Sequence, residues 1–124
     1  MTKVLVIDDD DNVCKYIKLV IKSEWPACKV LEANGPISAE QKLKENGIAL
    51  IVCDVNFNNI TGPQIIAANR KLVGQTKIIL LSCSDNTEKE GRELTRQGFN
   101  VVESIKKPVY PNDLRQLFDL HLND

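Results

Sequence analysis

The apolar residues of the chain fall into five short runs, separated by longer segments whose apolar positions have a helical spacing. Three of the runs, KVLVI at 3–7, IALIVC at 48–53 and KIILLS at 77–82, are apolar almost throughout. Such runs are typical of strands that are covered on both faces of a parallel sheet. The runs at 28–33 and 101–106 are more mixed, so we expect these two strands at the edges of the sheet.

The segments between the runs carry helix signals. Val13, Ile17, Val20 and Ile21 recur at helical spacing before Pro26. Further helices are predicted within 35–47, 62–74, 86–98 and 112–122. The first two of these have a proline near the start and a glycine at the end, as helices favour. The segment 86–98 is mostly polar, and we expect its helix to be weakly anchored.

Strands and helices that alternate in this way predict an α/β fold, a doubly wound five-stranded parallel sheet with helices on both faces. A length of 124 residues suits a single domain over 1–124, and 43% hydrophobic with 27% charged residues is ordinary for a globular protein. Folds of this class bind ligands beyond the carboxyl ends of the strands.

Composition excludes several other classes of function. The net charge of −1 creates no general attraction to nucleic acid or to an anionic membrane. The four cysteines form no C-x-x-C pair, and none is near His121 in sequence, so a zinc site has little support. We find neither a leader peptide nor an apolar stretch of the ~20 residues that a membrane span requires. We therefore expect a cytoplasmic protein with reduced thiols.

Charged and hydroxyl side chains stand where four of the predicted strands end. If the sheet is parallel, they all project at one edge: Asp8, Asp9, Asp10, Asp54, Ser82, Lys106 and Lys107. Clustered carboxylates repel one another unless a cation is present, and Mg²⁺ prefers carboxylate and phosphate oxygens. A further carboxylate could attack phosphorus to form an acyl phosphate, whose oxygens a hydroxyl and a lysine would bind. The strand ends thus predict a phosphoryl-transfer site.

Four segments carry a resemblance to a known family: VIDDDDNV, IVCDVNFNNITGP, IILLSCS and SIKKPV, in this order and on these strands. Together they resemble the response-regulator receiver domains of two-component signalling, of the chemotaxis-regulator kind, over essentially the whole chain. The resemblance implies a flavodoxin-like (βα)5 fold with strand order 2-1-3-4-5.

Residue by residue, the resemblance implies that Asp54 is the phospho-acceptor. It also implies that Asp8, Asp9 and Asp54 hold Mg²⁺, with the backbone carbonyl of Asn56 as a further ligand. Asp10 and Asp11 are more simply interpreted as capping residues of the first helix.

The same resemblance makes Ser82 the switch hydroxyl and Lys107 the lysine that completes the catalytic group with Asp54. The bond between Lys107 and Pro108 is often cis in the family. Gly62 matches the glycine that usually follows the acceptor loop. Lys106 is expected to point away into solvent.

Several positions depart from the family pattern. Asn58 replaces a proline, which predicts a more mobile acceptor loop. Ser104 replaces an aromatic residue, so the usual ring flip toward Ser82 has no counterpart. Cys83 is larger than the usual residue, and we expect it to obstruct the entrance of the site. The segment from Gly98 to Lys107 is longer than is common, which predicts a bulge or a longer turn.

Two positions that tune dephosphorylation in the family, Asn56 and Ser84, carry no acid here. Without an acid to orient attacking water, and with Cys83 at the entrance, we expect slow gain and slow loss of phosphate.

The resemblance implies a signalling receiver rather than an enzyme. It would take a phosphoryl group from a sensor histidine kinase or phosphotransfer protein. It would then switch the surface of the helix within 86–98, the strand 101–106 and the last helix toward an output domain or a downstream protein. The implied receiver binds neither nucleic acid nor membrane directly, and a phosphorylation-dependent dimer stays open. No output domain follows in the sequence, so we expect a stand-alone receiver or a piece of a longer regulator.

Two alternatives remain at this point. Asp8 and Asp10 also have the D-x-D spacing of a haloacid-dehalogenase-like phosphatase, with Asp8 as the nucleophile, but such an enzyme would leave Asp54 without a role. The other alternative is a pseudo-receiver, a protein-binding module that is never phosphorylated.

Overall fold

The computed structural model describes residues 2–57 and 59–122. Within them, five strands alternate with six helices, and their bounds follow the sequence prediction closely. The strands are β1 (Lys3–Ile7), β2 (Lys29–Ala33), β3 (Ile48–Asp54), β4 (Lys77–Ser82) and β5 (Asn100–Lys106). The helices are α1 (Asp11–Glu24), α2 (Pro36–Leu43), α3 (Gly62–Ala68), α4 (Arg70–Val73), α5 (Thr87–Arg96) and α6 (Pro111–Leu122).

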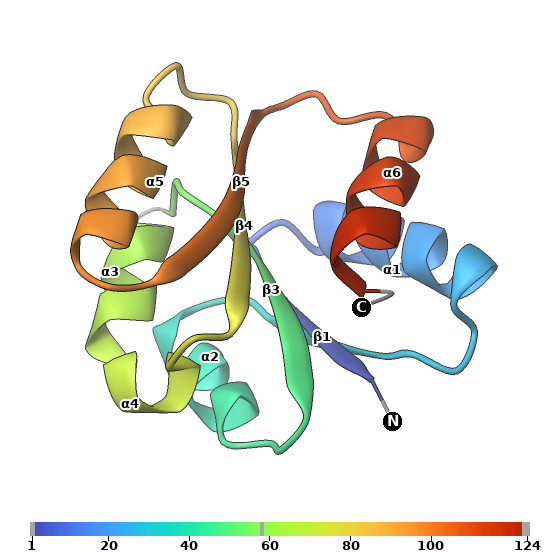
Figure 1. Cartoon of the computed structure of the whole chain (residues 1–124), viewed down its shortest axis with the longest axis horizontal. Helices are drawn as coiled ribbons and strands as arrows, with labels where there is room; N and C mark the ends of the chain where they lie inside the picture. The colour runs from blue at the N-terminus through green and yellow to red at the C-terminus, as the bar shows by residue number, and fades with distance from the viewer. Residues whose placement is uncertain (1, 58, 123–124) are drawn as a thin grey trace.

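The strands form one parallel sheet in the order β2-β1-β3-β4-β5. Figure 1 shows the sheet between two layers, with α1 and α6 on one face and α2, α3, α4 and α5 on the other. The doubly wound fold, the strand order and the edge positions of the two mixed strands are therefore confirmed. None of the helices in the described part of the chain is long and apolar enough to cross a membrane.

Side-chain alternation along the central strands builds two separate cores. Leu5 and Ile7 of β1 face the core under α2 to α5, whereas Val4 and Val6 face the core under α1 and α6. All four side chains are at most 1% exposed, which explains why this strand is apolar after Lys3. The continuous apolar runs thus reflect burial on both faces.

The segment predicted as one helix within 62–74 is divided in two. Asn69 leaves helical geometry (φ −113°, ψ 34°), and its side-chain amide donates to the carbonyl of Ile65 at 2.8 Å. An asparagine that bonds the backbone in this way competes with the regular helix. The result is α3 followed by the four-residue α4.

Strand β5 carries the bulge that the long segment before Lys107 predicts. Ile78 of β4 pairs with Val101, and the next residue, Ile79, pairs with Glu103, so Val102 is an extra residue in β5. The bulge shifts the alternation of the strand, and Ser104 follows it. The hydroxyl of Ser104 occupies the space that a Cβ on Gly91 of α5 would need.

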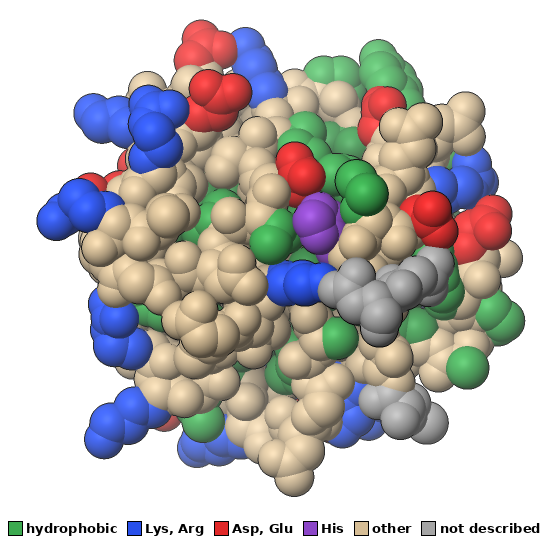
Figure 2. Space-filling view, viewed as in Figure 1, with side chains coloured by type: hydrophobic (Ala, Val, Ile, Leu, Met, Phe, Trp, Pro, Cys, Tyr) green, Lys and Arg blue, Asp and Glu red, His purple; other side chains and the backbone are tan. Residues whose placement is uncertain are grey.

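Helix α5 is held to the sheet by few side chains. Its buried residues are Thr87, Gly91 and Leu94, of which only Leu94 is large and apolar. Figure 2 shows Lys and Arg side chains along the margin of the molecule where α4 and α5 lie, with acidic side chains among them. The weak anchoring expected for this helix is confirmed.

Candidate phosphoryl-transfer site

The four consecutive aspartates after β1 have different environments. Asp8 is buried at 2% exposure, and one of its carboxylate oxygens accepts from the backbone N–H of Asp10 at 2.9 Å. Asp10 caps α1 by accepting from the backbone N–H of Asn12, and Asp11 lies in the first turn, where the helix dipole favours an acid. Asp9 is exposed. The run thus supplies two residues of the candidate site, Asp8 and Asp9, followed by two residues at the start of α1, Asp10 and Asp11.

Asp54 is the last residue of β3, and the chain returns close to it at Gly62. The backbone N–H of Gly62 donates to the carbonyl of Val55 at 2.8 Å. A Cβ at position 62 would overlap the carbonyl oxygen of Asp54 and lie 2.7 Å from Cys53 Sγ. Only glycine allows this approach, which fixes the backbone on either side of the acceptor loop.

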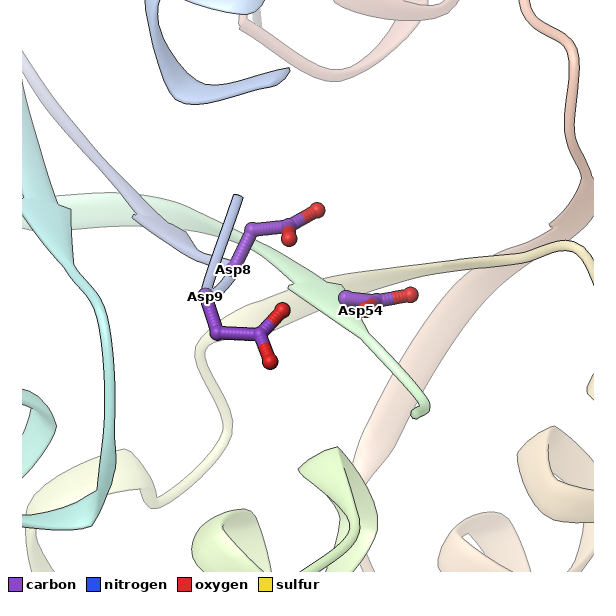
Figure 3. A group of neighbouring side chains, drawn as sticks. All are labelled: Asp8, Asp9 and Asp54. Carbon is purple, nitrogen blue, oxygen red and sulfur yellow. The ribbon is translucent and has the colours of Figure 1, made fainter. Parts of the chain in front are cut away.

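The three carboxyl groups expected to hold Mg²⁺ do come together. Asp8, Asp9 and Asp54 each offer an oxygen within 4.8 Å of the others. Figure 3 shows these side chains at the ends of β1 and β3, with their carboxyl groups extending in the same direction. Two of the three are nearly buried and one is exposed, so the cluster opens to solvent on one side. Oxygen ligands in this arrangement suit Mg²⁺, which keeps several of its waters.

Lys107 supplies the positive charge of the cluster. Its Nζ lies 3.2 Å from Asp8 Oδ2 and 3.5 Å from Asp54 Oδ1. Its backbone N–H donates to the carbonyl of Ser82 at 2.7 Å, and the bond to Pro108 is cis, as expected. The amine of Lys107 thus lies between a carboxylate directly after β1 and a carboxylate at the end of β3.

Burial dominates the electrostatics of this group. It raises the pKa of Asp8 above its ordinary value, although Lys107 and the N–H of Asp10 oppose the rise. Burial also raises the pKa of Asp54, and the charge of Asp8 adds to this effect. Burial alone would lower the pKa of Lys107, but the two carboxylates outweigh it and raise that pKa. Burial therefore opposes the ionisation of both acids, whereas the two carboxylates stabilise the protonated amine between them.

Ser82 is fully buried beside this group, and its hydroxyl oxygen is held by two donors. Asn56 Nδ2 donates to Ser82 Oγ at 2.6 Å, and the backbone N–H of Ser84 donates to it at 3.0 Å. The sequence did not predict the contact between Asn56 and Ser82, because 26 positions separate them and no periodic pattern connects them.

Two further predicted positions, Cys83 and Ser104, are not part of the carboxylate cluster. Cys83 is exposed and lines an apolar cavity of about 340 Å³, which it shares with Lys107, Tyr16 and Leu114. Ser104 packs against α5, and Asn58 lies outside the described residues.

Lys106 and Cys53 are sequence neighbours of site residues but have separate environments. Lys106 is exposed as expected, although it forms an ion pair with Asp85 in the loop after β4. Cys53 is fully buried, which raises the pKa of its thiol and agrees with a core residue rather than a redox sensor.

The chain therefore combines a five-stranded parallel α/β sheet with acids, a hydroxyl and a lysine at its carboxyl edge. The family model described as the response regulator receiver domain matches residues 4–119, so the chain belongs to this family.

Two relatives support this assignment along nearly the whole chain. ARR21 and ARR13 of Arabidopsis thaliana, both named as two-component response regulators, are 24% and 25% identical over 98% and 96% of the chain. The chain spans only 19% and 20% of the length of these relatives.

Solved structures show the same fold. A CheY-like receiver domain protein of Methanospirillum hungatei has a TM-score of 0.82 at 21% identity, covering 99% of this chain and 94% of that one. A receiver domain protein of Clostridium thermocellum gives 0.81 at 22% identity, with 99% and 95% covered. The response regulator TrrA of Thermotoga maritima, solved with Mg²⁺ and BeF, gives 0.77 at 22% identity, with 97% and 98% covered.

Proposed function

We propose that residues 1–124 form one receiver domain that accepts a phosphoryl group on Asp54 from a sensor histidine kinase or a phosphotransfer protein. One observation carries the proposal. Asp54 lies at the end of a central strand, nearly buried, with the amine of Lys107 at 3.5 Å and the carboxylates of Asp8 and Asp9 beside it. A carboxylate held in this way can act as a nucleophile when its excess negative charge is balanced.

In this reaction an oxygen of Asp54 forms a bond to phosphorus, while the bond from phosphorus to the donor's nitrogen breaks and that nitrogen keeps the electron pair. Lys107 is placed to bind an oxygen of the transferred group, since its amine already contacts Asp54. Asp8, Asp9 and Asp54, with the backbone carbonyl of Asn56, would hold Mg²⁺. When bound, the ion would neutralise charge on the transferring phosphoryl group. Ser82 would donate its hydroxyl proton to a phosphoryl oxygen.

The same group supports the other roles proposed for the chain. The receiver domain would catalyse only the gain of a phosphoryl group on its own Asp54 and the slow loss of that group, and it would process no separate substrate. Its partners are the phosphodonor protein and an output domain or downstream protein, and we propose a cytoplasmic location. Asp10, the second acid of the D-x-D spacing, is engaged as the cap of α1, which disfavours a phosphatase that uses Asp8 as its nucleophile.

Treatment with Mg²⁺ and a small phosphodonor should add one phosphate, and Asp54→Asn should lose this gain because the amide is not a nucleophile. Intact mass spectrometry measures both results. Asp85→Asn, at an exposed aspartate in the loop after β4, is the matched control and should keep the label. A label that persists in Asp54→Asn but disappears in Asp8→Asn would favour the phosphatase alternative. No label on any of these proteins would favour a pseudo-receiver.

Phosphorylation should change hydrogen exchange most across residues 82–98, which include the loop after β4 and helix α5. The physical reason is that α5 is held by one large buried side chain, so its local opening requires little free energy. With Ser104 in place of an aromatic residue, movement of the loop and of α5 would transmit the signal to β5 and α6. Exchange differences confined to α1 would contradict this output surface.

Cys83→Ala should speed the gain of phosphate, the loss of phosphate, or both. Cys83 is exposed on the cavity that it shares with Lys107, so its side chain lies near the approach to the site. In-line displacement requires the reacting atoms to be aligned at about 3–3.5 Å, so obstruction there would slow it. Both rates would be followed at one phosphodonor concentration. Unchanged rates would refute steric control by Cys83.

A further inference from the structure

The hydroxyl of Ser82 has a hydrogen-bonding pattern that its position in a strand does not require. Ser82 is 0% exposed, and its oxygen accepts from Asn56 Nδ2 at 2.6 Å and from the backbone N–H of Ser84 at 3.0 Å. Among the described residues, no group accepts the proton of this hydroxyl. Buried donors are almost always paired, so this hydroxyl can donate its proton to a group bound beside it.

The two donors leave the hydroxyl with little freedom. A serine oxygen has two lone pairs, and both are occupied when two N–H groups donate to it. The O–H bond must then point in the one remaining direction. Asp54 pairs with Leu81 in the sheet, directly before Ser82, so a phosphoryl group on Asp54 would stand close to this hydroxyl.

We infer that Asn56 is a positioning residue whose side-chain amide directs the proton of Ser82 toward the phosphoryl group on Asp54. The inference rests on the proposed function and adds a specific role for this side chain, which is separate from the metal-binding role of its backbone carbonyl. Asn56 would lower the barrier to phosphorylation by holding Ser82 in the orientation that the product requires.

The surrounding backbone supports such a role. Asn56 and Thr61 form an antiparallel bridge across the acceptor loop. Thr61 is the N-cap of α3 and exchanges hydrogen bonds with Gln64 in a capping box. The base of the loop is therefore tied to a helix end, and the exposed side chain of Asn56 extends from this support to the buried hydroxyl.

A double-mutant cycle with Asn56→Ala and Ser82→Ala tests the inference. At saturating Mg²⁺, Asn56→Ala should slow phosphorylation by a small phosphodonor roughly 3–10-fold, the range that one hydrogen bond supports. In the Ser82→Ala background the same substitution should change the rate by less than about twofold. Asn56→Asp has the same shape but can only accept, so it should slow the parent at least as much. Its effect should also shrink in the Ser82→Ala background.

Affinity for the phosphoryl analogue beryllofluoride gives a second readout without a chemical step. Measured with the parent, Asn56→Ala, Ser82→Ala and the double variant, it should show the same coupling. Asn59→Ala, at an exposed asparagine of the same loop, is the matched control and should match the parent. Equal slowing by Asn56→Ala in both backgrounds, or faster phosphorylation in the parent background, would overturn the inference alone. A parent protein that takes up no phosphate would overturn the proposed function and this inference with it.

Discussion

Replacing Lys107 with methionine should lower the free energy of unfolding by about 3 kcal/mol at neutral pH in the absence of metal. The amine pairs with Asp8 and Asp54, whose side chains are 4% and 9% exposed, so its removal leaves two buried carboxylates without a cation. Removing one partner of a buried ion pair costs about 3–5 kcal/mol. We expect the lower end because the lysine side chain is 19% exposed, so water can replace part of its charge.

The loss of stability in Lys107→Met should depend on pH. Burial raises the pKa of Asp8 and of Asp54 in the folded protein, so ionising them destabilises the folded state relative to the unfolded one. Without Lys107 these pKa values rise further. The difference in free energy of unfolding between the parent and Lys107→Met should therefore be largest at neutral pH. It should shrink as the pH falls through the raised pKa values toward about 4.

Denaturant unfolding of the parent and of Lys107→Met with a chelator present, at both ends of this pH range, measures the effect. Lys106→Met is the matched control, because the neighbouring lysine forms only an exposed pair with Asp85. Such pairs contribute about 0–1 kcal/mol. A Lys107 variant that is no less stable than the Lys106 variant, or whose deficit is independent of pH, would contradict this account of the site.

Mg²⁺ should stabilise the protein by about 2.7 kcal/mol when its free concentration is about 100 times its Kd. The ion would relieve the repulsion among Asp8, Asp9 and Asp54, which together exceed the charge of the single amine. The gain should shrink as the pH falls, because protons compete with the metal for the same carboxylates. Thermal unfolding over a series of Mg²⁺ concentrations measures the gain.

The double variant Asp8→Asn with Asp9→Asn should lose this stabilisation. Asp10→Asn is the control, since asparagine caps a helix about as well as aspartate and the change removes one nearby negative charge without touching the cluster. If the double variant gains as much from Mg²⁺ as the Asp10 variant does, the acidic cluster is not the metal site.

The sequence was sufficient for the sheet because burial on both faces leaves a plain signal. Consecutive residues of runs such as 4–7 and 78–81 can all be apolar only if neither face of the strand meets water, and the structure shows this in its two cores. The charged strand ends could be predicted for the same reason, since a parallel sheet brings every carboxyl end to one edge.

Features that depend on single side-chain hydrogen bonds were harder to predict from the sequence. The break at Asn69 depends on a side-chain bond to the carbonyl of Ile65, which helical periodicity does not reveal. The contact between Asn56 and Ser82 depends on how a loop folds back over a strand end. The position of the Lys107 amine between the carboxylates of Asp8 and Asp54 was likewise seen only in the structure.

The extra residue Val102 in β5 has a consequence for assembly. β5 is an edge strand, and a regular edge offers a row of unpaired N–H and C=O groups to any strand of another molecule. The irregular spacing at the bulge interrupts this row midway. Another chain could therefore extend the sheet in register over only part of β5. Association on this side of the molecule would depend on side-chain contacts made by α5 and α6, which a change in the position of α5 could alter.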